Sequence, residues 1–401
     1  MNGAIVVTGL GFVCPLGTGK SAVWDAWQKD EAGVRTLAED DPRLARGVDP
    51  VALPAVGRAG FVRGFQPKEH IQSSHLRRMD WCSRMIGASA TQAVTDAALP
   101  LESEHDQVRT ALVIGSCLGN QRETQKYMER VLQHGPGAGQ PILFPNLVLN
   151  AAGGYAAIEQ TIRGPNLSVS EHEASGEIAV ATAVDLLRAG MCDRVVVGGA
   201  DEFGSVYLGA LRERRLLDGA SSAVAAREDA VRGRIVPGEG AAAVVLEYED
   251  AARARGRAPY AAVGVARSGA IAAGPYAAPE PQAAAARLTR MLETRGQSSP
   301  PVSAVLGGAN GSPPRDELDR CLLSALERTQ PTPPTYRRLD GLVGDWPSRG
   351  MLSVALASLA VGHGSLPGAL ADSGAPSRIL IPGSGRSGVL VPVAIDVLAS
   401  P

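Results

Sequence analysis

The sequence predicts an α/β protein in which helices cover parallel or mixed β-sheets. Short runs rich in β-branched residues alternate with longer segments whose apolar residues recur at helical spacing, a pattern typical of this class. Only 4% of the residues are aromatic, and the abundant small side chains favour close packing of helices on sheets. With 401 residues, the chain exceeds one average domain, and two similar halves that share one core would account for its length.

Composition argues against several classes of protein. The formal net charge is −2 and 20% of the residues are charged, so there is no electrostatic case for nucleic-acid binding. No apolar run approaches the length needed to cross a membrane. The five cysteines show no CxxC spacing and the histidines no metal-ligand spacing, which argues against zinc and disulfides. We therefore expect a cytoplasmic protein, with no metal or cofactor, that handles small molecules or protein partners.

The N-terminal part of the chain contains two predicted strands and two predicted helices. The β-branched run Ala4–Thr8 is expected to be a strand that ends in a tight glycine turn at Gly9–Gly11, and a helix is expected over Ser21–Trp27. The apolar spacing within Arg78–Leu99 predicts an amphipathic helix. Thr110–Ser116 is predicted to be a buried strand.

The chain is expected to turn sharply from strand to helix at Glu171-His172-Glu173. The preceding segment Asn166–Ser170 predicts a short buried strand, and the apolar residues after Ala174 recur at helical spacing. A helix N-terminus offers free N–H groups and a partial positive charge to an anion. This corner carries two carboxylates and an imidazole, and it is therefore the candidate functional site.

The remainder of the chain repeats the alternation of strands and helices. Strands are expected over Arg194–Gly199, Val244–Glu247, Tyr260–Ala266 and Val302–Leu306. Helices are expected over Pro281–Glu293, Glu317–Glu327 and Met351–Val361. The acidic residue between two glycines, Glu239, is expected to be a turn residue that bonds to the backbone.

Three motifs resemble those of the β-ketoacyl synthase family. Residues Gly164–Gly176 (GPNLSVSEHEASG) are similar to the family pattern GPxxSVSTACASG, and Ile5–Gly17 are similar to VVVTGxGxxxPxG. Gly238–Ala241 resembles the family's GEGAG segment. The resemblance implies a thiolase-like five-layered αβαβα fold from two half-repeats, which we place at residues 1–250 and 251–401. It also implies that the excursion over residues 117–154 crosses the dimer interface and lines the acyl tunnel.

The resemblance assigns roles to positions whose side chains have changed. Glu173 stands where the family has its acyl-accepting cysteine, and His172 precedes it. Asn310 and Asp345 stand where the family has its two histidines. Ser384 takes the place of the gating phenylalanine. With Phe144 of the excursion, it is a candidate substrate-binding residue.

The resemblance therefore implies a protein that does not carry out ordinary Claisen condensation, because a carboxylate cannot hold an acyl chain as a thioester. The leading hypothesis is a chain length factor, or ketosynthase β subunit, of a type II polyketide or fatty-acid-type system. Such a subunit pairs with an active ketosynthase, shapes the shared acyl tunnel and works with an acyl carrier protein; a homodimer is the other expected assembly. Malonyl decarboxylation is disfavoured because Glu173 and Asp345 would repel a malonyl carboxylate.

Two interpretations of Glu173 remain open. In the first, the carboxylate only stabilises the helix N-terminus, a contribution of roughly 0.5–2 kcal/mol. In the second, Glu173, with His172 or Asp345, forms a new acid/base site, because clustered carboxylates in a closed pocket can raise a pKa towards neutrality. The second interpretation describes a stand-alone enzyme for cyclisation, dehydration or acyl transfer on a polyketide-like or carrier-bound acyl substrate.

Overall fold

The structure, a computed structural model, describes most of the chain. The described residues are 3–36, 58–71, 74–214, 216–217, 235–265, 268–271, 280–293, 300–367, 374–385 and 387–398.

Strands and helices alternate along the chain, as predicted. The strands are β1 (Ile5–Cys14), β2 (Gly17–Thr18), β3 (Val34–Thr36), β4 (Arg58–Gly60), β5 (Thr110–Gly115), β6 (Asn166–Val169), β7 (Arg194–Asp201), β8 (Gly240–Tyr248), β9 (Ala261–Val265), β10 (Gly269–Ala270), β11 (Ala304–Leu306), β12 (Thr335–Arg337), β13 (Arg378–Ile381), β14 (Val389–Leu390) and β15 (Val393–Asp396). The α-helices are α1 (Lys20–Gln28), α2 (Trp81–Ala97), α3 (Glu104–Val108), α4 (Gln121–His134), α5 (Ala151–Glu159), α6 (Ser175–Arg188), α7 (Ser205–Glu213), α8 (Glu249–Ala254), α9 (Pro281–Glu293), α10 (Pro313–Thr329), α11 (Asp340–Val343) and α12 (Gly350–His363). Short 3₁₀ segments are η2 (Pro67–Glu69), η3 (Ser74–Arg77), η4 (Pro136–Ala138), η5 (Phe144–Asn146) and η6 (Pro347–Arg349).

The main sheet repeats one strand order in the two halves of the chain. The N-terminal half has the order β6-β5-β7-β8-β1, and the C-terminal half has the order β12-β11-β13-β15-β9. In each half the first three strands pair in parallel and the remaining pairs are antiparallel. β1 pairs with β9 and so joins the halves. This repetition agrees with two half-repeats, while the boundary between residues 250 and 251 stays a prediction.

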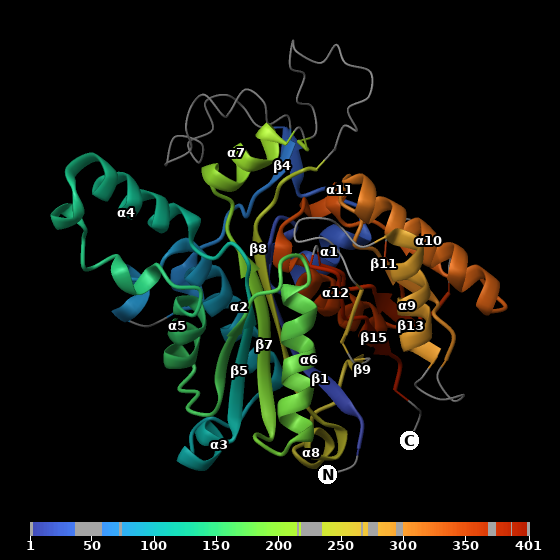
Figure 1. The fold of residues 1–401 in the computed structure, drawn as a ribbon. Helices are drawn as coiled ribbons and strands as arrows, with labels where there is room; N and C mark the ends of the chain where they lie inside the picture. Colours follow the sequence, from blue (N-terminus) through green and yellow to red (C-terminus); the bar gives the residue numbers. More distant parts are fainter. Residues whose placement is uncertain are drawn as a thin grey trace, which may run out of the picture.

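The core is divided into layers by the two halves of the sheet. The central cluster of buried apolar side chains joins both halves to α6 and α12. A second cluster packs α2 and α5 on the other face of the N-terminal half, and a third packs α9 and α10 on the other face of the C-terminal half (Figure 1). The order of layers is therefore helix, sheet, helix, sheet, helix, which confirms the predicted αβαβα fold.

The glycine turn expected at Gly9–Gly11 is wrong, because β1 runs through both glycines to Cys14. These glycines allow α2 to lie directly against the strand. A Cβ atom on Gly9 would lie 2.1 Å from the carbonyl oxygen of Ala93, and one on Gly11 would lie 1.9 Å from that of Ser89. The glycines are therefore needed for a tertiary contact and not for a turn.

The buried strand expected before the candidate site is also wrong in part. The segment does form β6, but its residues are exposed or half-buried. β6 pairs with β5 at the edge of the sheet, so only one of its sides is covered by a described strand. The expected helices and the other expected strands are present, with ends shifted by a few residues. No helix within the described part of the chain is long and apolar enough to cross a membrane.

Candidate functional site

The turn between β6 and α6 places Glu173 at the start of the helix. His172 has a φ of 47°, in the left-handed region, and this conformation reverses the direction of the chain. The Ser175 hydroxyl holds the turn together, because it accepts a hydrogen bond from the Glu171 N–H at 2.9 Å and donates one to the His172 carbonyl at 2.7 Å. Glu173 is 9% exposed and lies just before the helix cap residue Ala174. This position is near the positive end of the helix dipole, and both interpretations of Glu173 stay predictions.

Asn310 and Asp345 contact each other in a buried network with Arg349. The Asn310 side-chain amide donates to Asp345 Oδ2 at 2.8 Å, and Arg349 Nε donates to Asp345 Oδ1 at 2.9 Å. The other end of the Asn310 amide accepts hydrogen bonds from the N–H and the hydroxyl of Ser312 at 3.0 and 2.7 Å. Both oxygens of the Asp345 carboxylate are thus occupied, and the orientation of the Asn310 amide is fixed on both sides.

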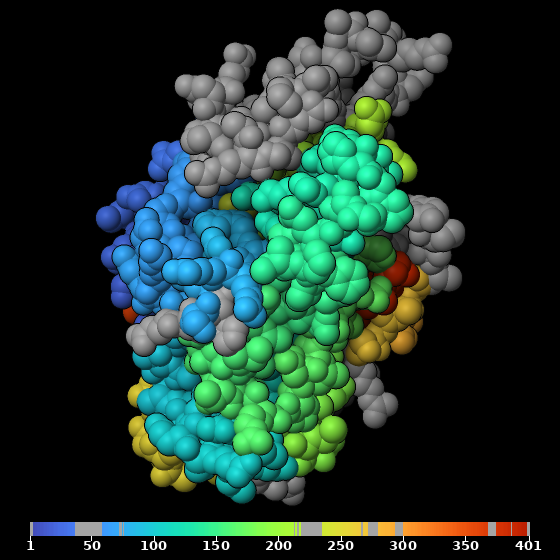
Figure 2. Space-filling model, turned by 90° about the vertical axis from the view of Figure 1, so that its left-hand side faces the viewer, coloured from blue at the N-terminus to red at the C-terminus, as the bar shows by residue number. Residues whose placement is uncertain are grey.

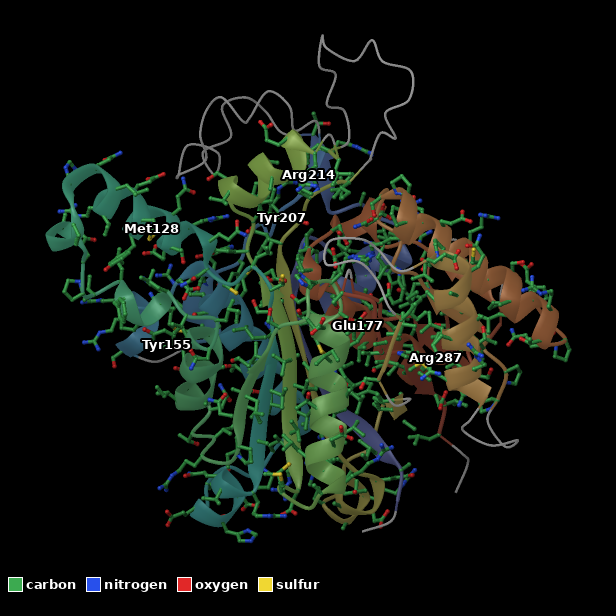
Figure 3. The ribbon with its side chains drawn as sticks, viewed as in Figure 1. Met128, Tyr155, Glu177, Tyr207, Arg214 and Arg287 are labelled. Carbon is green, nitrogen blue, oxygen red and sulfur yellow. The ribbon has the colours of Figure 1, made fainter. Side chains whose placement is uncertain are left out.

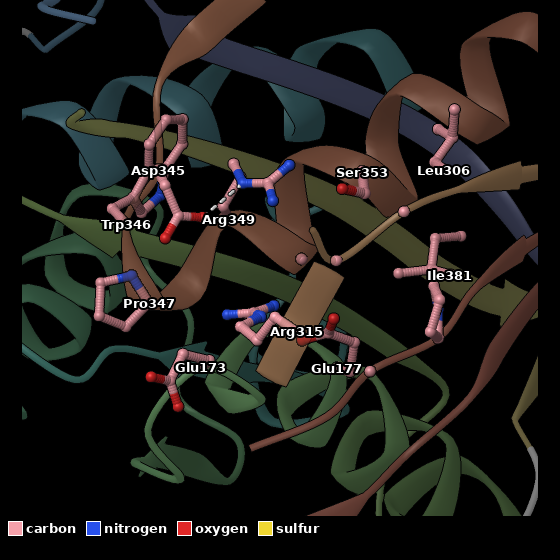
Figure 4. A pocket seen from close by; sticks show the side chains of 15 residues that line it. Glu173, Glu177, Leu306, Arg315, Asp345, Trp346, Pro347, Arg349, Ser353 and Ile381 are labelled. Atoms are coloured by element: carbon pink, nitrogen blue, oxygen red, sulfur yellow. Dashed lines mark hydrogen bonds and ion pairs between the residues drawn. The ribbon is translucent and has the colours of Figure 1, made fainter. Parts of the chain in front are cut away.

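A small cavity brings Glu173 together with the carboxylate of Asp345 (Figure 4). Its volume is about 10 Å³, which is room for roughly one water molecule. Arg315 and Arg349 also line the cavity. The structure therefore places Glu173 and Asp345 at one site, as expected from the sequence, but it adds two guanidinium groups that the sequence analysis did not identify.

Glu177 is a further acid of this cavity that the sequence analysis missed. It lies in the first turn of α6, four residues after Glu173. Its side chain lines the same cavity and is 4% exposed. Two glycines leave room for its side chain. A Cβ atom on Gly350 would lie 2.1 Å from Glu177 Cδ, and one on Gly383 would lie 3.0 Å from Glu177 Cγ. The sequence offered no clear signal for Glu177, because Glu173 precedes the helix and the helical spacing rule does not apply to this pair.

Burial and charge act against each other at this site. Burial raises the pKa of Glu177 to about 7, although the positive charges of Arg315 and Arg349 oppose the rise. For Arg315, in the first turn of α10, burial acts to lower the pKa of the guanidinium. Its neighbouring carboxylates outweigh this effect and raise that pKa above its ordinary value; they are Asp345, Glu173, Asp319 and Glu177. The site thus contains one carboxyl group that titrates near neutral pH.

Asp201 fixes the position of the segment that carries Arg349. One of its oxygens accepts a hydrogen bond from the Ser348 N–H at 2.8 Å, and the other accepts one from the Ser116 hydroxyl at 2.9 Å. The second oxygen also binds the N–H groups of Cys117 and Leu118. Asp201 is fully buried at the end of β7. Its hydrogen bonds connect η6 to the loop after β5.

Four predicted site residues are not among those that line the cavity. His172 is exposed, and neither it nor the buried Ser384 is among the residues that line the cavity. Phe144 is 62% exposed and lies in η5, where its ring is 6.4 Å from that of Tyr127. The roles of these residues stay predictions. Asn310 also does not line the cavity, but it contacts Asp345, which does.

The fold is similar to solved ketosynthase structures over nearly its whole length. The ishigamide ketosynthase/chain length factor superposes with a TM-score of 0.82 at 20% identity and covers 100% of both chains. A type II polyketide synthase acyl-carrier protein in complex with its ketosynthase gives a TM-score of 0.80 at 17% identity, with 99% of this chain and 100% of that chain covered. At such identities the similarity establishes the fold.

Curated relatives match the chain in part. The 3-oxoacyl-[acyl-carrier-protein] synthase 2 of Rhizobium meliloti is 30% identical over 268 residues, which cover 65% of this chain and 62% of that protein. The protein of the same name from Vibrio cholerae is 26% identical over 263 residues, covering 65% and 61%. The chain thus spans less than two thirds of the length of these relatives. The model of the β-ketoacyl synthase N-terminal domain matches residues 2–252, more than half of the chain, and the chain therefore belongs to the β-ketoacyl synthase family.

Proposed function

We propose that this chain is a non-condensing ketosynthase-like subunit that pairs with an active ketosynthase and helps to fix the length of the acyl product. One observation supports the proposal: Asn310 and Asp345, which the resemblance assigns to the family's two histidine positions, bind each other. Asp345 also forms an ion pair with Arg349, and the resemblance assigns Glu173 to the cysteine position.

The chemistry of these side chains supports the proposal. A carboxylate at Glu173 cannot form a thioester, so it cannot hold a growing acyl chain between extensions. Asn310 donates hydrogen bonds but does not exchange protons. Asp345 already accepts a hydrogen bond on each of its oxygens. The three groups therefore stabilise the fold at this place without supplying the nucleophile and the proton donors of condensation.

An exposed apolar surface offers a place for the partner. The helix α4 has no buried residue in this chain, and large apolar side chains are exposed on it and on the segments that follow. They are Met128, Leu132, Ile142, Phe144, Val148, Leu149 and Ile158. Figure 2, coloured by residue number, shows the face of the molecule to which α4 and these segments contribute. Figure 3 shows Met128 on α4, well away from Glu177 at the centre of the molecule. Large exposed apolar patches mark protein interfaces, and one solved structure of similar fold is the ishigamide ketosynthase/chain length factor.

Co-purification tests the pairing. The chain is co-expressed with a cysteine-containing ketosynthase from the same biosynthetic gene set, and the two should elute together in size-exclusion chromatography. Leu132→Lys, at a side chain 78% exposed on α4, should separate them, while Glu327→Lys on the exposed side of α10 should not. If the chain remains a homodimer in the presence of the ketosynthase, the heterodimer proposal is wrong.

Product analysis tests the length-controlling role. The pair, supplied with an acyl carrier protein and malonyl units, should give a product of defined length. Phe144→Ala should change that length, because Phe144 is exposed in the excursion that we place at the shared tunnel. Extension of malonyl units by this chain alone would contradict the proposal.

A stand-alone acid/base enzyme is the second candidate function. One observation favours it: the cavity beside Glu173 contains Glu177, whose pKa burial raises to about 7, a value suited to general acid/base catalysis at neutral pH. Glu173→Gln distinguishes the two functions. Loss of product formation in a folded, correctly assembled variant supports the enzyme, whereas unchanged product formation supports the non-catalytic subunit.

A further inference from the structure

The helix α4 is attached to the body of the molecule by its first part. Residues 121–125 are half-buried, whereas most of residues 126–134 are exposed. α4 lies against α7, and Figure 1 shows it projecting outward from there. Farther along the helix, Arg130 Nε donates to the Ala138 carbonyl at 2.9 Å, which is a contact within the excursion itself. The orientation of α4 therefore depends on how its first turn is held.

Arg122 makes three contacts that hold this first turn. Its backbone N–H donates to Glu202 Oε1 at 2.7 Å. Its side chain donates from Nε to the Phe203 carbonyl at 3.1 Å and from Nη2 to Glu239 Oε2 at 3.1 Å. The same Glu239 oxygen accepts a hydrogen bond from the Phe203 N–H at 3.3 Å. One guanidinium group thus connects α4 both to the segment after β7 and to the residue before β8.

Two glutamines of α4 flank these contacts with weaker ones. The Ser205 hydroxyl donates to Gln125 Oε1, and the Tyr207 N–H donates to Gln121 Oε1 at 3.4 Å. Both bonds join neutral groups, and such bonds contribute less than a hydrogen bond to a charged group. Because α4 has no buried residue, buried apolar side chains of the helix do not support them. The ion pair of Arg122 is therefore the strongest attachment among these contacts.

The guanidinium group of Arg122 faces buried carboxyl groups from three segments. They are Asp80 at the start of α2, Glu202 after β7 and Glu239 before β8, and all three are buried. The Glu239 side chain is 1% exposed, and the Arg122 side chain that pairs with it is 21% exposed. A neutral side chain in place of Arg122 would leave the Glu239 carboxylate buried without its ion-pair partner, which is strongly unfavourable. The attachment of α4 is thus electrostatic and depends on one arginine.

We propose that Arg122 is a positioning residue, which holds α4 in one orientation and thereby sets the surface that the chain offers to its partner. The part that concerns the partner rests on the proposed function. A helix of 14 residues is only marginally stable by itself, so α4 detaches and unfolds part of the time when Arg122 is replaced. A partner then binds only the fraction of molecules in which α4 is in place, and its apparent affinity falls by that fraction.

Hydrogen exchange of the purified full chain, measured by mass spectrometry, tests the attachment without a partner. In Arg122→Gln the amides of α4 should exchange at least about tenfold faster than in the wild type, while those of α2 and α6 keep their wild-type rates. Arg122→Lys keeps a positive charge opposite Glu239 but loses the fork of donors, and it should restore part of the protection. Arg130→Gln is the matched control, because it makes the same replacement on the exposed part of α4; α4 should stay protected in it.

Titration with the cysteine-containing ketosynthase measures the consequence for pairing. Arg122→Gln should raise the Kd at least about tenfold, Arg122→Lys should raise it less, and Arg130→Gln should leave it unchanged. The inference is overturned if α4 in Arg122→Gln exchanges as in the wild type, if Arg130→Gln has the same effect, if all segments exchange faster together, or if the Kd does not change. If the wild type does not pair with the ketosynthase, the proposed function fails, and the exchange rates still decide whether Arg122 positions α4.

Discussion

The replacement Glu177→Gln should remove a pH dependence of stability that the wild type carries. Glu177 is buried, and its pKa is raised from 4.5 to about 7 in the folded chain. Between these values the folded state binds one more proton than the unfolded state, so the free energy of unfolding falls as the pH rises. A difference of about 2.5 pH units corresponds to about 3 kcal/mol, since each unit is worth about 1.4 kcal/mol. This stabilisation is present in full below pH 4.5 and lost above about pH 7.

Urea denaturation at pH 5 and pH 8 measures the effect. Glutamine has nearly the same shape as a protonated glutamic acid but does not titrate. The variant should therefore resemble the wild type at pH 5 and be more stable by about 3 kcal/mol at pH 8. Other titrating groups, such as the buried Glu202 with a pKa raised by burial to about 8, cancel in the comparison of the two chains. Glu102→Gln, at an exposed position, is the matched control and should follow the wild type. An equal difference between Glu177→Gln and the wild type at both pH values would refute the reasoning.

Three further predictions concern the arginine network, the glycines and the cysteine position. Arg349→Met should lower the free energy of unfolding by about 3–5 kcal/mol, because Asp345 then loses its buried ion-pair partner; urea denaturation measures the change. Gly11→Ala should destabilise the chain by more than the roughly 1–3 kcal/mol typical of overpacking, because its Cβ would lie 1.9 Å from a backbone oxygen of α2. Gly209→Ala, where a Cβ meets nothing within 4 Å, should stabilise α7 by about 0.5–1 kcal/mol. Glu173→Cys supplies a thiol at the position that the resemblance assigns to the family's cysteine, while Asn310 and Asp345 stay at those it assigns to the histidines, so mass spectrometry should show no malonyl-dependent chain extension.

Each of these predictions has a result that contradicts it. A wild-type unfolding curve for the Arg349 variant means that the ion pair with Asp345 contributes little to stability. Equal effects of the two glycine replacements mean that the close contact between β1 and α2 relaxes at little cost. Extended product from the Glu173 variant means that the side chains now at the histidine positions still support condensation.

Much of the fold could be predicted from the sequence because its signals are local. The apolar runs that became β5, β7 and β8 and the helical spacing of α2, α6 and α12 are properties of neighbouring residues. The errors came where the meaning of a residue depends on distant parts of the chain. Gly9 and Gly11 predict a turn by themselves, but the approach of α2 gives them another role. The strand before Glu173 has apolar residues, but its exposure follows from its place at the edge of the sheet.

By itself the sequence determined that a helix follows a strand directly after Glu173, and its resemblance to ketosynthases implied that Asn310 and Asp345 stand where that family has histidines. Only the tertiary structure decided that Glu177 lies at the same cavity, that Arg349 pairs with Asp345, and that Arg315 reaches this site from another helix. The physical reason is that burial and charge set the state of a carboxyl group. Both depend on which side chains surround that group in the folded chain, and these come from segments far apart in the sequence.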